Sequence, residues 1–409
     1  MKNVFWCIGG GVLQQPLISQ ARKLGYSVLV TDGADNCACA NLADLFYAVD
    51  IFDIDAHIVL ANEIKLKHEI VGVLAAGIDA PVTMSKLAEH LGLPGVPSQI
   101  SEIVHYKSKF RDFCNDNGID TPFYRVFGLE DLDTLSEFLD TVELPFIIKN
   151  VDSSGSRGTK IFYCRNNDEE QRIAKEAIEF SKSKTFLVES VWIGQECTVE
   201  TLYDVNGKFH PCFITDRMFD YSTGYPIEIG LVSPSQLSSE AQTECFALAE
   251  QVANKLGINT GAAKFDIIYT QDGPRIIEMT TRLSGGFDCQ YLVPSASGKN
   301  IMGAAILTAC GREFPLEFLL DIKQQYAVSK SHWPENGKIV DVIGVDKAIQ
   351  LPGVEHIFFR KSVGDVVEGF KNCVDRVSFI IATGATLREA EQNAHRAIDR
   401  IELRVRKSA

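Results

Sequence analysis

The sequence lacks a long apolar run, an excess of basic residues and any tandem repeat. Its 409 residues include 54 acidic and 40 basic side chains, which gives a formal net charge of −14 at pH 7. No stretch approaches the roughly 20 consecutive apolar residues that cross a bilayer. A strongly acidic surface also disfavours nucleic acid and anionic membranes, because both carry phosphate charge. We therefore expect neither nucleic acid nor a membrane as a partner.

Cysteine pairs with the spacing of a metal site are missing too. The eleven cysteines are scattered, no CxxC occurs, and the one close pair is Cys37 and Cys39. This usage favours reduced thiols in a cytosolic protein over a structural zinc site. The N-terminus runs directly into a strand-like segment, without a signal peptide's long apolar region. We expect a cytoplasmic protein.

The composition is that of a folded protein with ample material for a core. Hydrophobic residues make up 45% of the chain and charged residues 23%, which is ordinary for globular proteins. The length suits two or three domains of roughly 100–200 residues each. We predict three, with boundaries at residues 1–97, 98–315 and 316–409.

Residues 1–97 predict a parallel sheet, because apolar runs alternate with helical patterns. The runs are 4–8, 26–31 and 71–74, and the helical patterns are 13–23 and 81–91. This is a βαβ arrangement.

A glycine turn follows the first of these runs. It consists of Gly9, Gly10 and Gly11, and Asp32 follows the second run. The glycine turn together with Asp32 resembles a dinucleotide-binding fingerprint, but the spaced G-x-G-x-x-G pattern is missing. A tight structural turn is therefore favoured over a cofactor site, and a nicotinamide oxidoreductase is disfavoured for the same reason.

The rest of the chain predicts two further units rich in strands. Residues 98–315 carry a helix at 107–117 and strand-like runs at 144–149, 185–189, 198–203, 209–215, 263–269 and 275–279. A turn at 270–274 joins the last two runs as a hairpin. Residues 316–409 carry strand-like runs at 337–345, 356–360 and 376–383, and then a helix at 387–401. Thr386 and Glu389 have the spacing of a capping box at the start of this helix.

A polar loop follows the strand-like run that ends at Lys149. Residues 152–159 have the sequence DSSGSRGT. Glycine and serine let a backbone close over phosphate groups with its N–H groups directed inward, and Lys149 adds a positive charge nearby. Taken alone, such a loop is more often a solvated surface loop.

Two carboxylates lie on the runs that the hairpin joins. Asp266 and Glu278 are twelve residues apart, and pairing of the two strands would bring them to one point. Two hard oxygen ligands beside phosphate groups suit Mg2+. Glu278 also lies between Ile277 and Met279, and a buried acid needs a partner such as a metal ion. The alternative is a pair of exposed strand carboxylates.

The order of these segments resembles the ATP-grasp superfamily over essentially the whole chain. The matching segments are YKSKFR at 106–111, NGIDTP at 117–122, PFIIK at 145–149, the loop at 153–158, ESVWIGQE at 189–196, and FD at 265–266 with EMTTR at 278–282. Residues 1–97 resemble that family's pre-ATP-grasp domain, and the tail resembles the β-rich C-terminal domain of biotin carboxylase and of L-amino-acid ligases. The resemblance implies a mixed α/β and α+β architecture with an ATP-grasp fold, in which a small lid covers the nucleotide.

The resemblance also implies a role for each matching residue. Lys107 and Lys149 would neutralise the α- and β-phosphates of ATP, and Thr280 stands where the family usually has Asn. The loop residues Ser153, Ser154, Gly155 and Ser156 would cover the transferred phosphoryl group. The nucleoside would be contacted by Glu189, Val191 and Trp192 at adenine and by Glu196 at ribose. Mg2+ or Mn2+ would be bound by Asp266 and Glu278, the phosphoryl group by Arg282, and substrate or phosphate by Arg217.

These expectations together predict an ATP-dependent carboxylate–amine ligase. It would form an amide bond through an acyl phosphate and release ADP and phosphate, with small-molecule substrates that include an amino acid. One alternative is a biotin-carboxylase-like or carbamoyl-phosphate-synthase-like enzyme that phosphorylates bicarbonate. A second is a catalytically silent nucleotide sensor, which only Thr280 suggests. By analogy with biotin carboxylase, we also expect a homodimer.

Overall fold

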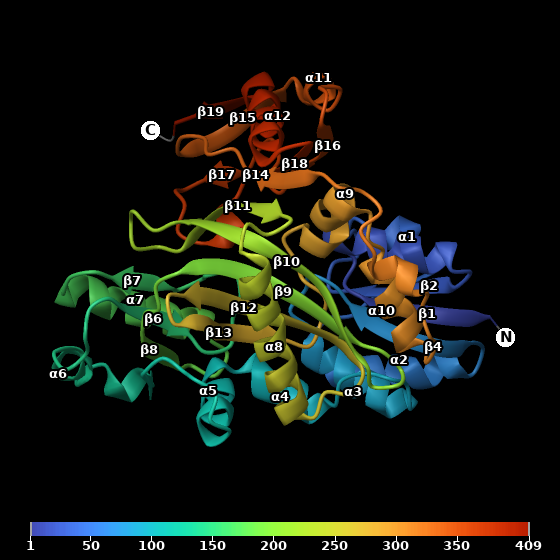
Figure 1. Cartoon of the computed structure of the whole chain (residues 1–409), viewed down its shortest axis with the longest axis horizontal. Helices are drawn as coiled ribbons and strands as arrows, with labels where there is room; N and C mark the ends of the chain where they lie inside the picture. The colour runs from blue at the N-terminus through green and yellow to red at the C-terminus, as the bar shows by residue number, and fades with distance from the viewer. Residues whose placement is uncertain (1, 408–409) are drawn as a thin grey trace.

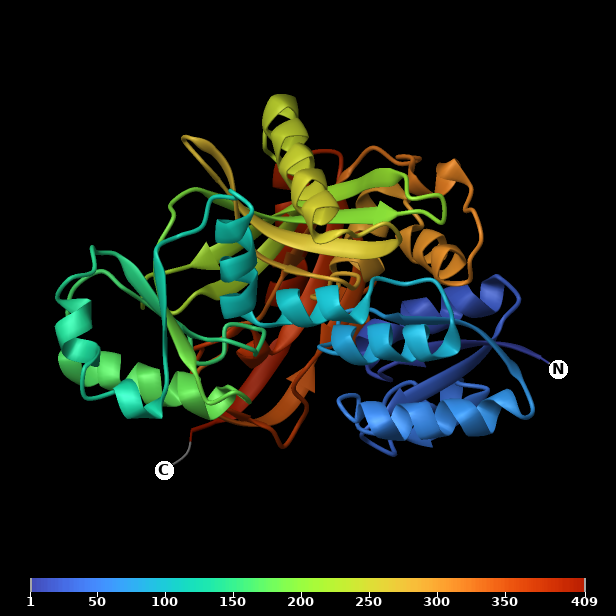
Figure 2. The same ribbon diagram turned by 90° about the horizontal axis from the view of Figure 1, so that it is seen from below.

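Four β-sheets organise the computed structural model, which describes residues 2–407. An eight-stranded antiparallel sheet lies in the middle. The N-terminal unit (blue) and residues 124–190 (green) lie on opposite sides of it, and the C-terminal region (red) lies above it (Figure 1). Figure 2 shows the same separation of the blue and green units from below. The predicted mixed α/β architecture is confirmed.

The N-terminal sheet is parallel, as the alternating pattern predicts. Its strand order is β3-β2-β1-β4. The strands are β1 (Asn3–Ile8), β2 (Ser27–Asp32), β3 (Leu45–Ala48) and β4 (Glu69–Ala75), and the helices are α1 (Gln15–Lys23), α2 (Ile54–Lys65) and α3 (Pro81–Leu91). Helices cover both faces of a parallel sheet. Its buried strands therefore consist of nearly continuous apolar residues.

The glycine turn after β1 is held closed by Asp32. The Gly10 N–H donates to Asp32 Oδ2 over 2.8 Å, and Gly9 has a φ of +91°. A Cβ on Gly10 would lie 2.4 Å from Cys37 Sγ, so the chain is too close here for a side chain. The contacts agree with a structural turn.

The central sheet has the strand order β13-β12-β9-β10-β11-β14-β18-β16. In this order the strands are Gly273–Thr280, Gly261–Thr270, Gln195–Tyr203, Phe209–Asp220, Ile227–Ser233, Tyr326–Lys330, Ser378–Gly384 and Val354–Phe359. Helix α8 (Ser239–Leu256) packs on strands β9, β12 and β13. The last three strands come from the C-terminal part of the chain, so that part continues the central sheet edge to edge. The domain boundaries at 97 and 315 stay a prediction.

A small sheet with two helices forms a separate layer, which we call the lid. Its strand order is β5-β8-β6-β7. The strands are Tyr124–Phe127, Phe186–Ser190, Phe146–Asn150 and Lys160–Phe162, and the helices are α6 (Leu135–Leu139) and α7 (Asn167–Phe180). Phe127 and Phe186 stack with ring centroids 5.3 Å apart in its core. Burial of each such ring contributes roughly 2–3 kcal/mol.

The remaining elements complete the C-terminal region and the connections. A three-stranded sheet has the order β17-β15-β19, with Val366–Val367, Gly337–Ile343 and Glu402–Arg406. The other helices are α4 (Ser98–His105), α5 (Lys107–Asp116), α9 (Val293–Ser297), α10 (Ile301–Ala309), α11 (Val345–Ala348) and α12 (Leu387–Arg400). Within residues 2–407, none of the helices has the length and apolar character needed to cross a membrane.

Helix α12 starts with a capping arrangement that differs slightly from the predicted one. Thr386 Oγ1 accepts the N–H of Glu389 over 3.2 Å, as the capping-box spacing predicts. The Glu389 carboxylate in turn accepts the N–H of Ala385, one residue before the cap. The first bond satisfies an N–H of the first helical turn, and the second satisfies one that precedes the helix.

Candidate active site

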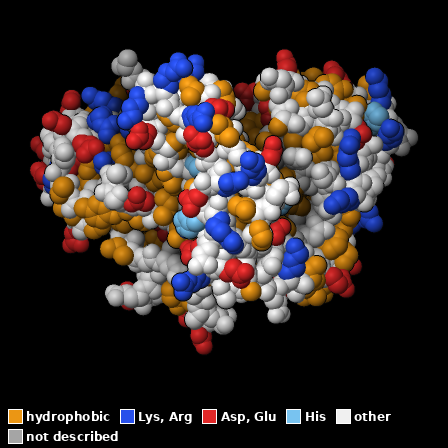
Figure 3. Space-filling view, turned by 90° about the horizontal axis from the view of Figure 1, so that it is seen from above, with side chains coloured by type: hydrophobic (Ala, Val, Ile, Leu, Met, Phe, Trp, Pro, Cys, Tyr) orange, Lys and Arg blue, Asp and Glu red, His pale blue; other side chains and the backbone are white. Residues whose placement is uncertain are grey.

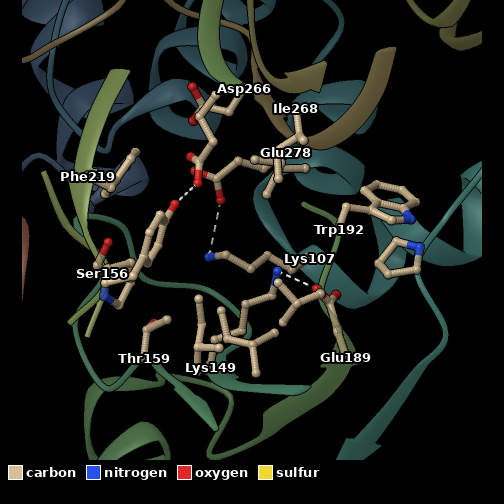
Figure 4. Close-up of a pocket in the computed structure, with 18 of the residues that line it drawn as sticks. Lys107, Lys149, Ser156, Thr159, Glu189, Trp192, Phe219, Asp266, Ile268 and Glu278 are labelled. Carbon is tan, nitrogen blue, oxygen red and sulfur yellow. Dashed lines mark hydrogen bonds and ion pairs between the residues drawn. The ribbon is translucent and has the colours of Figure 1, made fainter. Parts of the chain in front are cut away.

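A cavity of about 390 Å3 lies between the lid and the central sheet. Figure 4 shows Trp192 and Glu189 on one side of it, Ser156 on the other, and Lys107 pointing across it towards Glu278. Thirteen of the fourteen residues predicted for the site line this cavity. The exception is Arg282, which lies outside it. We call this space the nucleotide cavity, after the role that the sequence assigns to its lining.

A buried ion triad forms one wall of the nucleotide cavity. Glu189 on β8 lies 2.5 Å from Lys149 Nζ on β6 and 3.0 Å from Arg111 Nε on α5. Burial opposes the negative charge, but Arg111 and Lys149 outweigh it and hold the pKa of Glu189 below its ordinary value. Arg111 also donates to the Ile277 carbonyl over 2.6 Å. The triad thereby joins the lid to strand β13 of the central sheet.

Asp266 and Glu278 face each other across strands β12 and β13. They are direct register partners, so the predicted pairing of the two strands is confirmed. Asp266 Oδ1 lies 2.5 Å from Lys264 Nζ and 3.1 Å from Arg217. Glu278 Oε2 lies 3.6 Å from Lys107 Nζ.

The chemistry of this acid pair fits a magnesium ion. Burial would raise the pKa of Glu278, but Lys107 and Lys264 outweigh it and lower this pKa, so the carboxylate stays ionised. Within residues 2–407, no group of three or more His, Cys, Asp or Glu side chains is arranged to hold a metal. An ion here would therefore have two carboxylates, with phosphate oxygens and water as its other ligands. That is the usual coordination of Mg2+, which keeps several waters.

The polar loop between β6 and β7 is held from three sides. Lys107 Nζ donates to the Ser153 carbonyl over 2.8 Å, and Ser154 Oγ donates to Asp79 Oδ2 over 2.5 Å. From the C-terminal region, the Cys373 N–H donates to the Gly155 carbonyl over 3.0 Å. The loop, which we call the phosphate loop, thus contacts the N-terminal unit, the central unit and the C-terminal region.

Glu196 lies at the central-sheet side of the nucleotide cavity. It accepts a hydrogen bond from the Tyr221 hydroxyl, and Arg217 lies 3.9 Å away. Burial raises the pKa of Glu196. Tyr221 and its stacking partner Phe219 also line the cavity, although the sequence patterns do not indicate them.

Arg217 lies deep between carboxylates on three strands. Its guanidinium is 2.8 Å from Glu228 and 3.1 Å from Asp266. Burial works against the charge, yet Asp266, Glu228 and Glu196 raise the pKa of Arg217 well above its usual value. The guanidinium therefore stays charged beside the acid pair.

A second and larger cavity of about 820 Å3 adjoins the first. Arg282 lines this cavity, with its guanidinium 3.6 Å from Asp79 and a 2.8 Å bond to the Leu283 carbonyl. The larger cavity extends from the glycine turn of the N-terminal unit to the C-terminal region. Six residues line both cavities: Ser154, Gly155, Arg217, Asp266, Glu278 and Cys373.

Two buried acids support the floor of the larger cavity. Glu200 Oε2 accepts the N–H of Ser284 over 2.9 Å, and Asp288 Oδ2 accepts from the Thr215 hydroxyl over 2.9 Å. The other oxygen of each acid has no hydrogen-bond partner among the described residues. Burial raises the pKa of Glu200 to about 7 and that of Asp288 well above its ordinary value.

Several charged residues of the site are absent from the sequence-based predictions. Lys264 is two residues before Asp266, so the period of a strand places both on one face, and this signal was available. Asp79 follows β4 at the carboxyl end of a parallel sheet, where ligand sites of such sheets lie. Glu228 and Arg376, 2.6 Å apart, have no comparable signal, because 148 residues separate them.

Comparison with known families assigns the central and C-terminal parts of the chain. Residues 142–290 match the model of the ATP-grasp domain, and residues 332–406 match that of the L-amino acid ligase C-terminal domain 2. The chain therefore contains an ATP-grasp domain followed by a C-terminal domain of the L-amino acid ligase type. The predicted resemblance is confirmed.

Individual relatives are distant but cover nearly the whole chain. A formate-dependent phosphoribosylglycinamide formyltransferase from Sulfurisphaera tokodaii is 24% identical over 97% of this chain and 96% of its own. The crystal structure of an L-amino acid ligase from Bacillus licheniformis superposes with a TM-score of 0.82 at 19% identity, over all of both chains. The biotin carboxylase domain of a 2-oxoglutarate carboxylase from Hydrogenobacter thermophilus, solved with MgADP and bicarbonate, gives 0.73 at 16% identity over 99% and 91%. Both structural likenesses show the fold.

Proposed function

We propose that this protein is an ATP-dependent carboxylate–amine ligase that forms an amide bond and releases ADP and phosphate. One observation carries the proposal: the two cavities meet at the acid pair, the phosphate loop and Arg217. A phosphoryl group at the junction would be reachable from the nucleotide cavity and from the larger cavity. An acid substrate in the larger cavity would then receive it.

Within this proposal the nucleotide cavity binds ATP. Lys107 and Lys149 neutralise phosphate charge, as point charges at the phosphate end. Trp192 and Val191 border the adenine end, where contact comes from the backbone, because Lys149 and Arg111 already occupy the Glu189 carboxylate. Glu196 faces the ribose.

Asp266 and Glu278 would hold Mg2+, which supplies charge neutralisation between the phosphate oxygens. To do so, Asp266 exchanges its contacts with Lys264 and Arg217 for the ion. Those two cations stay at the junction and are then free to face phosphate oxygens. The phosphate loop, held by Asp79 and Cys373, excludes water from the transferred group.

The bond changes follow from these positions. The substrate carboxylate attacks the γ-phosphorus, the bond to the β-phosphate oxygen breaks, and an acyl phosphate and ADP result. The amine nitrogen then attacks the acyl carbon, the C–O bond to phosphate breaks, and the ammonium proton leaves. Arg282 and Arg217 stabilise the negative charge that develops on the phosphoryl oxygens and on the acyl oxygen.

The larger cavity favours an organic acid over bicarbonate as the phosphoryl acceptor. Its volume of about 820 Å3 is twice that of the nucleotide cavity, far more than a three-oxygen ion needs. An amino acid is the substrate class that the C-terminal domain match favours for one of the two positions. We also propose a homodimer, by analogy with the biotin carboxylase domain from Hydrogenobacter thermophilus, which is a dimer in its crystal structure. Light scattering at micromolar concentration tests this proposal.

The test of the reaction is product analysis. The purified chain, with ATP and Mg2+, is incubated with amino acids and small carboxylates in pairs, and phosphate release and product masses are recorded. We expect ADP, phosphate and a product whose mass equals the two substrates minus water. Formation of AMP and pyrophosphate would indicate adenylation and contradict the acyl-phosphate mechanism. Absence of ADP with every acid would contradict the ligase proposal.

A further inference from the structure

The larger cavity is lined by a concentration of basic side chains in a protein with a net charge of −14. On the face that Figure 3 shows, acidic and basic side chains are interspersed. Inside the cavity, six basic side chains meet five acids, of which Asp288 has a raised pKa. The basic side chains are Arg157, Arg217, Lys264, Arg282, Arg360 and Arg376.

Five of these six basic side chains have a carboxylate within 4.0 Å. Arg157 and Arg282 both contact Asp79, and Arg376 contacts Glu228. The contacts of Arg217 and Lys264 with Asp266 complete the pairing. Arg360 differs, because no carboxylate of residues 2–407 lies within that distance of its guanidinium.

The backbone of Arg360 is held in place, although its guanidinium has no carboxylate partner among residues 2–407. It directly follows strand β16, and its N–H donates to the Val377 carbonyl over 2.9 Å. The residue is exposed and lines the larger cavity but not the nucleotide cavity. Burial of part of the group and the guanidiniums of Arg376 and Arg157 lower the pKa of Arg360. An arginine stays protonated regardless, so this corner has a charged guanidinium with no carboxylate in direct contact, although Asp375 is near enough to favour its charge.

We propose that Arg360 binds a second anionic group, a carboxylate or a phosphate, of a substrate in the larger cavity. The inference rests on the proposed ligase function and adds a substrate class to it. The reacting carboxylate does not fill this role, because it must lie at the junction beside Asp266 and Glu278. The phosphates of ATP have Lys107 and Lys149 in the other cavity. A guanidinium suits a carboxylate or a phosphate because its planar fork donates two parallel hydrogen bonds.

The first experiment compares matched substrates. In the ADP-release assay, L-glutamate is paired with L-glutamine and succinate with succinamate as acids, and amino acids are paired with their amides as amines. We expect KM for the anionic member of the productive pair to be at least about tenfold lower. The position at which the preference occurs, acid or amine, identifies the substrate that carries the group. Equal KM values at both positions would overturn the inference.

The second experiment uses two neighbouring basic residues. Arg360→Ala should raise KM for the anionic substrate by about 10- to 100-fold, the range for loss of a hydrogen bond to a charged group, and Arg360→Lys should restore part of it. KM for ATP should change by less than about threefold, because ATP binds in the other cavity. Lys361→Ala removes the same charge one residue further on, where Lys361 Nζ donates to the Val366 carbonyl, and should leave both KM values unchanged.

Direct binding separates failure of this inference from failure of the ligase proposal. Calorimetry measures glutarate and inorganic phosphate binding to the full chain with Mg2+ and ADP. We expect Arg360→Ala to weaken this binding at least tenfold and Lys361→Ala to leave it unchanged. That result would support the anion site even if no acid substrate gives turnover. Ligase activity without any effect of Arg360→Ala, or anion binding that survives it, overturns the inference and leaves the ligase proposal standing.

Discussion

Two pairs of buried acids, one at the nucleotide cavity and one beneath the larger cavity, have pKa values shifted in opposite directions. Around the nucleotide cavity, Glu189 and Glu278 have lowered pKa values because lysine and arginine side chains outweigh the cost of burial. Beneath the larger cavity, Glu200 and Asp288 have raised pKa values because burial is the dominant effect and cations are too few. The same residue types therefore keep their charge readily in the first pair and bind a proton more readily in the second.

This difference in pKa shifts fits the different ligands that we propose for the two cavities. An ionised carboxylate such as that of Glu278 suits the metal ion that would accompany ATP in the proposed reaction. Acids with raised pKa values beneath the larger cavity add less negative charge to it, which suits the anionic substrate that we propose. Among the basic residues that line the larger cavity, Arg360 is the one with no carboxylate of residues 2–407 within 4.0 Å. Each basic side chain that lines the nucleotide cavity has a carboxylate within 4.0 Å, whereas Arg360 in the larger cavity has none among residues 2–407.

The largest expected effect comes from removing an ionised acid of the junction. Glu278→Gln keeps the shape but loses the carboxylate that would bind Mg2+. We expect kcat to fall by about 10³-fold or more, since such electrostatic groups contribute several kcal/mol to the transition state. Steady-state kinetics and circular dichroism together measure the loss at constant fold. Asp272→Asn, in the turn of the same hairpin, is the matched control, and a folded Glu278→Gln protein with wild-type turnover would rule out the metal assignment.

Paired and unpaired cations should also differ in their effect on stability. Lys149→Met leaves Glu189 buried with only Arg111, and we expect a loss of about 3 kcal/mol in the free energy of unfolding, as for other broken buried pairs. Arg360→Ala breaks no pair and should change it by less than about 0.5 kcal/mol. Urea denaturation measures both. Equal losses would mean that the two cavities do not differ in charge balance.

Arg282 tests the junction from the side of the larger cavity. Arg282→Lys keeps the charge but loses the planar fork of donors. We expect kcat to fall by roughly 10²-fold, the scale for an oriented donor to developing charge, with a much smaller change in ATP affinity because Arg282 does not line the nucleotide cavity. Kinetics are compared with a direct nucleotide-binding measurement, and Arg275→Lys, on strand β13 shortly before Arg282, serves as control. Equal losses in rate and binding would make Arg282 a ground-state phosphate ligand instead.

The nucleotide cavity was more predictable from sequence than the larger one, for a physical reason. Its residues lie in short segments whose spacing predicts which side chains come together. Asp266 and Glu278 lie on either side of a hairpin turn, and strand pairing then places them opposite each other. Helix α3 was predicted with its bounds because Pro81 and Gly92 mark its two ends. Helix α8 is absent from the predictions, although Ser238 and Gly257 cap it.

The larger cavity depends on contacts between segments far apart in the chain. Asp79 meets Ser154, Arg157 and Arg282, and no local pattern around any of them indicates the others. The Cys373 contact with Gly155 spans more than 200 residues. Such contacts follow from how the sheets pack, which spacing rules do not describe.

The smallest expected effect concerns Glu200 beneath the larger cavity. Glu200 has a pKa near 7 in the folded protein and an ordinary value near 4.5 when unfolded. Between these values the folded state binds more protons than the unfolded state, so the free energy of unfolding must fall as pH rises. This contribution is fully present at low pH, decreases by about 2 kcal/mol between pH 5 and pH 7, and levels off above the folded pKa. Glu200→Gln, which resembles the protonated acid in shape and does not titrate, should remove that slope. Urea unfolding of the wild-type and Glu200→Gln proteins at half-unit pH steps measures the difference between their free energies of unfolding. The contributions of Asp288 and of all other acids cancel in this difference. Parallel curves for the two proteins would show that Glu200 is ionised in the folded state, and the contrast between the two cavities would then be lost.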